Sequence, residues 1–141
     1  MLGKKDHLEH LANVALFENC SKKELRMIMS NGSIVELPEG RVLTSEGSTG
    51  HDAFVVLEGS VMAVRGGRKV ADLGPGAFVG ELSLLDGAPR SATVTCSSPC
   101  KVLVLSRGEF VALLQTVPSI TRKLLASLAS RVRERDRERL G

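Results

Sequence analysis

The chain has 141 residues, enough for one domain with a hydrophobic core, and its 43% apolar content excludes extended disorder. Its net charge of +3 is small, and the five arginines between Arg131 and Arg139 alternate with acidic residues, which indicates a mixed-charge helix end rather than a nucleic-acid arm. Aromatic residues make up only 3%, so stacking platforms for single-stranded nucleic acid are scarce.

The first eleven residues lack the apolar stretch of a secretory signal, and no run of 18 apolar residues predicts a membrane span. The three cysteines, Cys20, Cys96 and Cys100, do not have metal-ligand spacing, and their odd number favours reduced thiols in the cytoplasm. Cys96 and Cys100 flank Ser-Ser-Pro, so we expect buried thiols there, with a disulfide across the turn as the alternative.

The N-terminal part of the chain has helical patterns with capping-box spacing, in which Asp or Ser is followed three residues later by Glu. This spacing occurs in Asp6-His-Leu-Glu9 and in Ser21-Lys-Lys-Glu24. The two boxes predict helices around Leu8–Leu16 and Leu25–Met29, with Phe17 in the core between them.

Between residues 33 and 106 the pattern changes to short apolar runs separated by glycines, which predicts strands. Gly66-Gly67 lies between two such runs and is typical of a two-residue hairpin turn. The fold class is therefore mainly β with flanking helices, an antiparallel β-roll of the jelly-roll kind. The expected strands are Ile34–Leu37, Arg41–Ser45, Ala53–Leu57, Ser60–Arg65, Lys69–Leu73, Ala92–Cys96 and Lys101–Leu105.

The C-terminal part again predicts helices. A third capping box, Ser106-Arg-Gly-Glu109, begins a helix that we expect to end near Thr116, and Pro118 suits the first turn of the next one. That helix has an apolar stripe at three- and four-residue steps: Ile120, Leu124, Leu125, Leu128 and Val132. We expect a single domain over 1–141, with N-terminal helices at 1–32, the roll at 33–106 and C-terminal helices at 107–141.

One stretch, Phe78–Val94, reads Phe-Val-Gly-Glu-Leu-Ser-Leu-Leu-Asp-Gly-Ala-Pro-Arg-Ser-Ala-Thr-Val and indicates a ligand site. If Leu82–Leu85 forms a single helical turn, its free backbone N–H groups suit an anion. Gly80 lets the backbone approach that anion closely.

Charged and hydroxyl side chains complete the pattern. The guanidinium of Arg90 matches two phosphate oxygens, Ser91 adds a hydroxyl, and the carboxylate of Glu81 suits a ribose 2′-OH. The alternative is a surface ion pair between Glu81 and Arg90, with the glycines as ordinary turn residues. That alternative leaves the rest of the string unexplained, so we favour binding.

Phe78–Val94 resembles the phosphate-binding cassette of cyclic nucleotide-binding domains. The resemblance extends along the chain, and its C-terminal part resembles the B and C helices of bacterial catabolite-activator-type proteins. It is carried outside the cassette by Leu16-Phe17, Ser21–Leu25, Gly40, Glu46-Gly47, Phe54–Val61, Ser106 to Phe110, and Pro118–Arg131.

The resemblance implies a β-roll that holds the cyclic nucleotide. In it Glu81 takes the ribose 2′-OH and Arg90 the cyclic phosphate, assisted by Ser91 and by the amides of Gly80, Leu82 and Ser83. Val70 and Ala71 are expected near the base, the alternative being that both belong to the core of the roll.

The resemblance also bears on the base. Ser91 occupies the position where several cGMP-responsive relatives have threonine, so it favours cAMP as the ligand, with cGMP as the alternative. The C-terminal helix supplies base contacts in the bacterial activators, and the corresponding residues here are Arg135 and Asp136. Asp136 can accept from the adenine amino group and Arg135 can stack on the purine. The alternative is that both are solvated residues on a charged helix end.

The sequence predicts a non-enzymatic regulatory module whose C-terminal helices move when cyclic nucleotide binds. A homodimer through the last helix and an effector protein or domain are the expected partners. No helix-turn-helix follows the last helix, so we expect no DNA binding by this chain. It stands alone or belongs to a larger transcription factor, channel, kinase or acyltransferase.

Two other classes of function stay open. A cupin-like metal enzyme on a small β-barrel would need clustered ligands. The only histidines are His7 and His10, expected on the solvated surface of the first helix, and His51 in a turn, so no metal is predicted. A degenerate domain that only mediates assembly is the third class, against which Glu81 and Arg90 argue.

Overall fold

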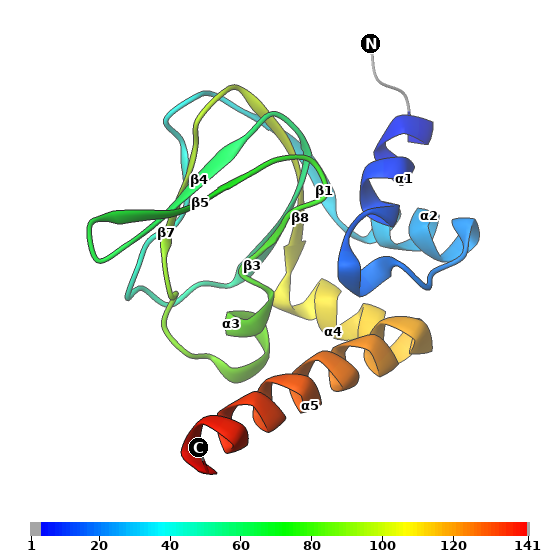
Figure 1. Ribbon diagram of the computed structural model, residues 1–141. Helices are drawn as coiled ribbons and strands as arrows, with labels where there is room; N and C mark the ends of the chain where they lie inside the picture. The colour runs from blue at the N-terminus through cyan, green and yellow to red at the C-terminus, as the bar shows by residue number, and fades with distance from the viewer. Residues whose placement is uncertain (1–3, 141) are drawn as a thin grey trace.

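Two four-stranded antiparallel sheets form a β-roll with helices at both ends of the chain (Figure 1). The computed structural model describes residues 4–140, and the side chains of that range apart from those at 4–6, 81, 82 and 137–140. The strand order is β1-β8-β3-β6 in one sheet and β2-β7-β4-β5 in the other. The strands are β1 (Ser33–Leu37), β2 (Val42–Thr44), β3 (Asp52–Glu58), β4 (Val61–Arg65), β5 (Arg68–Leu73), β6 (Phe78–Val79), β7 (Thr93–Cys96) and β8 (Cys100–Ser106).

The helices confirm two of the three expected capping boxes. Ser21 and Ser106 each accept a hydrogen bond from the backbone of the glutamate three residues later, whose side chain accepts from the serine N–H in return. The box at Asp6 is wrong, because the first helix already begins at Lys4. The helices are α1 (Lys4–Ala12), the 3-10 turn η1 (Ala15–Phe17), α2 (Lys22–Asn31), α3 (Glu81–Asp86), α4 (Arg107–Thr116) and α5 (Pro118–Leu140).

The predicted hairpin at Gly66-Gly67 is confirmed. Arg65 pairs with Arg68 across the turn, and both glycines have positive φ, at 59° and 78°. Two consecutive left-handed residues match the twist of the flanking strands β4 and β5, which is why glycine suits both positions.

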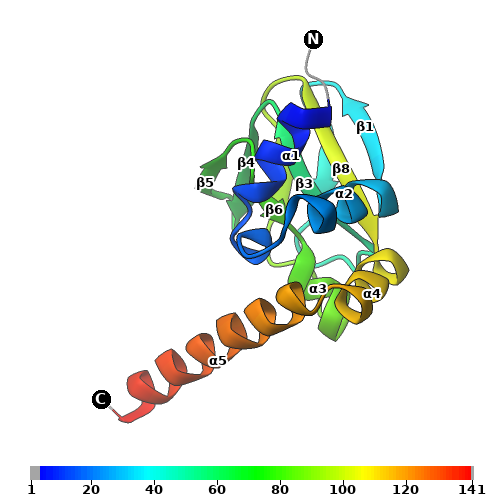
Figure 2. The ribbon, with the colours of Figure 1, turned by 90° about the vertical axis from the view of Figure 1, so that its right-hand side faces the viewer.

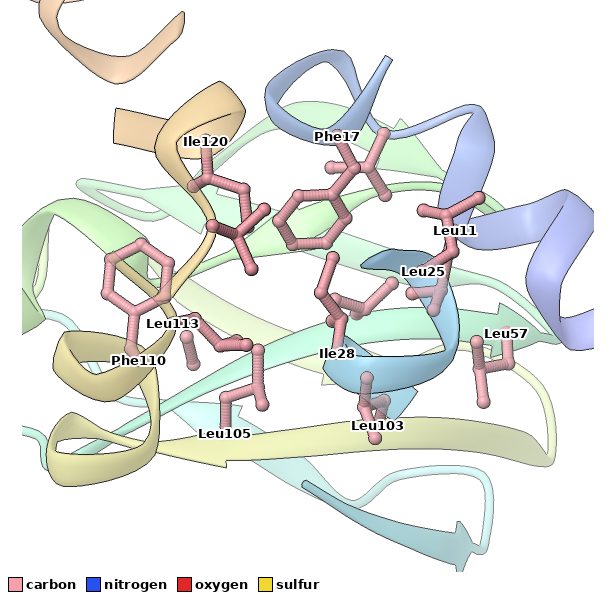
Figure 3. Packing of buried hydrophobic residues seen from close by; sticks show 14 of the residues in the cluster. Leu11, Phe17, Leu25, Ile28, Leu57, Leu103, Leu105, Phe110, Leu113 and Ile120 are labelled. Atoms are coloured by element: carbon pink, nitrogen blue, oxygen red, sulfur yellow. The ribbon is translucent and has the colours of Figure 1, made fainter. Parts of the chain in front are cut away.

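The hydrophobic core has two parts. One lies between the roll and the helices, where Phe17, Ile28, Phe110 and Ile120 are fully buried (Figure 3). The other lies inside the roll and includes the thiols of Cys96 and Cys100, which are buried and free, as expected. Both thiols therefore pack as small apolar side chains in the core.

Among the described side chains of α5, those that enter the core lie near its N-terminal end. Ile120 and Leu124 are buried, whereas Leu125 is 61% exposed and Val132 is 59% exposed. Figure 2 shows the C-terminal half of α5 running away from the roll. The predicted apolar stripe therefore divides into a packed and an exposed portion. Within the described residues, no helix has the length and apolar content required to cross a bilayer.

Candidate functional site

The guanidinium of Arg90 lies inside the molecule. Arg90 is 5% exposed, and its Nη1 donates a 2.9 Å hydrogen bond to the carbonyl oxygen of Gly80. Its Nη2 donates to the carbonyl oxygen of Asp52 at the start of β3. The cation is therefore fixed between the start of the cassette and the neighbouring sheet.

Two glycines give this guanidinium its space. A Cβ atom at Gly50 would collide with Nη2, Nε and Cζ of Arg90, and one at Gly80 would collide with Nη1. Gly80 also has a positive φ of 86°, which favours glycine independently. Gly50 was not predicted from the sequence, because its importance depends on a contact with a residue 40 positions away.

The backbone of Arg90 is held as firmly as its side chain. Its N–H donates to the carbonyl of Ser48 and its carbonyl accepts from the N–H of Gly47, both at 2.8 Å. The N–H of Glu46 donates to Oγ1 of Thr93 at 3.0 Å. The turn between β2 and β3 thus brackets the arginine, a role that the Glu46-Gly47 motif did not reveal by itself.

The short helical turn expected after Gly80 is confirmed as α3. Gly80 precedes it and Gly87 follows it, each with left-handed backbone, and the N–H of Gly87 donates to the carbonyl of Ser83. Ser83 is half-buried. The side chains of Glu81 and Leu82 lie outside the described residues, so the expected contact of Glu81 with ribose stays a prediction.

Ser91 follows Arg90 and is exposed, and its carbonyl oxygen accepts a 3.0 Å hydrogen bond from Nε of Arg65 on β4. On β5, Ala71 pairs with the buried Ala63 and packs against the core inside the roll. Val70 is 51% exposed, on the opposite face of the same strand. Of these two candidates for a base contact, only Ala71 faces the interior.

The two candidates on α5, Arg135 and Asp136, are exposed. They belong to the part of the helix that extends from the roll (Figure 2). The structure therefore does not bring them together with Arg90.

The histidines of α1 differ from expectation, since His7 is 6% exposed and His10 is half-buried. The prediction of solvated surface is wrong because α1 packs against β3, where Nε2 of His7 lies 3.9 Å from Oε2 of Glu58. The same oxygen is 3.0 Å from Nζ of Lys101, and this carboxylate raises the pKa of Lys101. Among the described residues, no group of three His, Cys, Asp or Glu side chains could hold a metal ion.

A β-roll with flanking helices and a glycine-capped helical turn beside a buried arginine defines a protein of the cyclic nucleotide-binding class. The family model for the cyclic nucleotide-binding domain matches residues 34–117. The chain belongs to the cyclic nucleotide-binding domain family.

Curated relatives and solved structures agree with this assignment. The chain is 34% identical over 128 residues to the cyclic AMP receptor protein of Thermus thermophilus, covering 87% of this chain and 59% of that protein. It is 33% identical over 95 residues to a cAMP-dependent protein kinase regulatory subunit of Yarrowia lipolytica, covering 67% of this chain and 25% of that protein. The chain thus spans less than two thirds of these curated relatives.

Among solved structures, the Thermus thermophilus catabolite activator protein has a TM-score of 0.78 at 34% identity, over 88% of this chain and 61% of that one. The N-terminal domain of a transcriptional regulator from Streptomyces coelicolor has a TM-score of 0.76 at 32% identity, over 92% of this chain and 93% of that one.

Proposed function

We propose that this chain is a non-enzymatic, cytoplasmic sensor module for cAMP. The observation that carries the proposal is the buried guanidinium of Arg90, fixed against Gly80 and Asp52 within the cassette. A buried guanidinium that contacts the residue before a helical turn rich in backbone donors suits a singly charged cyclic phosphate.

The remaining contacts follow from the chemistry of the ligand. The amides of Gly80, Leu82 and Ser83 and the hydroxyl of Ser91 donate to phosphate oxygens, and the carboxylate of Glu81 accepts from the ribose 2′-OH. Ala71 lies on the inner face of β5, where it suits contact with the base. Serine at position 91 supports cAMP, and cGMP is the competing ligand that a titration must test.

Binding would reach the C-terminal helices through the segment that Arg90 contacts. The carbonyl of His51 accepts a 2.9 Å hydrogen bond from the N–H of Arg107, the first residue of α4. The next residue, Asp52, accepts from Arg90 and pairs with Ser106. A shift of Arg90 toward an incoming phosphate would therefore change the contacts at the start of α4.

This movement would reposition α5, on which Arg135 and Asp136 could then reach the base and the exposed Leu125 could contact a second copy of the chain. The output is expected to come from an effector protein or domain, because the module itself supplies ligand recognition. Sharing this domain with longer relatives does not assign their other activities to this chain.

The test is calorimetric titration of the purified protein with cAMP, cGMP and 5′-AMP. We expect binding of cAMP, weaker binding of cGMP, and no binding of the open-chain monophosphate at the same concentrations. Failure of both cyclic nucleotides to bind the folded protein would contradict the proposal.

Replacing the cation tests its role in that site. Arg90→Ala should weaken cAMP binding by about 2–4 kcal/mol, the scale of charge-assisted hydrogen bonds to a buried anion. Arg90→Lys keeps the charge but not the fork, so it should recover only part of the loss. Arg68→Ala removes an exposed arginine from the hairpin tip and is the matched control, and circular dichroism verifies that each variant is folded.

A further inference from the structure

The tip of the β4–β5 hairpin is attached to the cassette by an arginine that the resemblance does not assign. Arg65 is exposed at the end of β4, and its Nε donates a 3.0 Å hydrogen bond to the carbonyl oxygen of Ser91. Ser91 follows Arg90 directly, so this bond holds the Ser91–Ala92 peptide group, which lies one residue beyond the buried cation.

A second bond attaches the same hairpin tip to the turn between β2 and β3, which contacts the backbone of Arg90. The N–H of Gly66 donates to Oε1 of Glu46 at 3.0 Å, and the N–H of Glu46 donates to Oγ1 of Thr93 at 3.0 Å. Next to Glu46, the N–H of Gly47 donates to the carbonyl of Arg90. The hairpin tip therefore contacts both Ser91, the residue after Arg90, and the turn that holds the backbone of Arg90.

We propose that Arg65 is a positioning residue for the cyclic phosphate, an inference that rests on the proposed function. Its hydrogen bond fixes the Ser91 peptide group, and with it the direction of the Ser91 hydroxyl and of the Arg90 backbone. Because the fork of Arg90 must meet two phosphate oxygens at once, a small rotation of its backbone misaligns both hydrogen bonds.

The competing explanation is a surface hydrogen bond that only steadies the hairpin. Such a bond affects the stability of the protein with little effect on how the bound phosphate is oriented. The two explanations therefore differ in the stereochemistry of binding, which cAMP analogues with one phosphate oxygen replaced by sulfur can measure.

The experiment compares wild type, Arg65→Ala, Arg65→Lys and Arg68→Ala. Arg68 is the matched control, because it pairs with Arg65 across the turn, is exposed, and its side chain has no hydrogen bond or ion pair among the described residues. Each protein is titrated with cAMP and with the Sp and Rp phosphorothioate diastereomers of cAMP, and its thermal midpoint is measured without ligand.

Arg65→Ala should weaken cAMP binding by about tenfold, the equivalent of one hydrogen bond, and should change the Sp-to-Rp affinity ratio. Arg65→Lys keeps the positive charge without the Nε donor, so it should show the same altered ratio. Arg68→Ala should match wild type in both quantities.

Three results would overturn the inference. They are an Sp-to-Rp ratio in Arg65→Ala equal to that of Arg68→Ala, a lowered thermal midpoint with unchanged affinity, and full recovery by Arg65→Lys, which would indicate charge alone. Wild-type protein that binds none of the nucleotides would instead contradict the proposed function, from which the inference starts.

Discussion

The guanidinium of Arg90 donates a hydrogen bond to the backbone carbonyl of Asp52, 38 positions earlier in the chain. Asp52 pairs in turn with Ser106, the residue that caps α4. The start of β3 thus joins the cation of the cassette to the strand end from which the C-terminal helices begin. If Arg90 binds the ligand as proposed, a change at this contact is expected to affect the position of the C-terminal helices.

Gly50 provides a direct test of the space around Arg90. Gly50→Ala should displace the guanidinium and weaken cAMP binding by about tenfold or more, because misplacing one charge-assisted contact costs at least 1.4 kcal/mol. Gly74→Ala is the control, since a Cβ atom there meets nothing within 4 Å and its φ is not positive. Calorimetry showing equal affinity for the two variants would contradict this account of the site.

The variants Gly59→Ala and Gly40→Ala together distinguish the cost of backbone strain from the cost of a steric collision. Both have left-handed backbone, with φ of 90° and 89°, so alanine at either position should cost about 1–2 kcal/mol. At Gly59 the new Cβ would also collide with the carbonyl oxygen of Pro99, whereas at Gly40 it would meet nothing within 4 Å.

We therefore expect Gly59→Ala to lower the free energy of unfolding by about 3 kcal/mol or more, well beyond the loss in Gly40→Ala. Urea denaturation measures both values. Equal losses in the two variants would show that the turn at Gly59 relaxes enough to avoid Pro99.

The capping box at Ser106 should contribute measurably to stability. Ser106→Ala removes the acceptor for the N–H of Glu109, a bond of 3.2 Å, and should lower the free energy of unfolding by about 1 kcal/mol. Ser130→Ala on the exposed face of α5 is the control, because its hydroxyl has no partner among the described residues. Its change should stay within about 0.5 kcal/mol in the same denaturation assay.

Stability should fall in alkaline solution because of Cys96. Burial raises the pKa of this thiol from its ordinary value of 9.0 to about 11, with a hydrogen bond to Cys100 as the next cause. Between these two values the unfolded chain loses the proton and the folded chain keeps it, so the contribution is complete below pH 9 and declines toward pH 11.

Denaturation of wild type and Cys96→Ala across the range around the pKa values of 9.0 and about 11 would check this prediction. The free energy of unfolding should fall more steeply with rising pH in wild type than in Cys96→Ala. Ionisable groups away from Cys96 are common to both proteins and cancel in the comparison. Parallel curves for the two proteins would refute the prediction.

The sequence was most informative where a local rule determined the structure. Glycines separated the strands, and the boxes at Ser21 and Ser106 marked the starts of α2 and α4 correctly. Strand β6 was missed because Phe78-Val79 is too short to show a period of two. Its pairing with β3 is set by tertiary contacts that no local pattern encodes.

The site divides in the same way. Arg90 and Gly80 were predicted because the cassette motif is contiguous, whereas Gly50 and the Asp52 carbonyl come from a distant turn and show no chemical signature of their own. The burial of His7 was missed for a related reason, since its neighbour Glu58 lies on another element. Backbone carbonyls that accept hydrogen bonds from a buried side chain cannot be identified from residue type.

The 23 residues of α5 make a rod of about 34 Å at 1.5 Å per residue. It is fastened near its first turns by Ile120 and Leu124, while its outer half projects beyond the roll (Figure 2). When a rod is held at one end, the displacement of its far end grows with its length. A rotation of only about 10° at the fastened end would therefore move the far end by roughly 6 Å for that length. If the proposed movement occurs, a small rotation near the roll would displace the far end of the helix far enough to exchange one set of contacts for another.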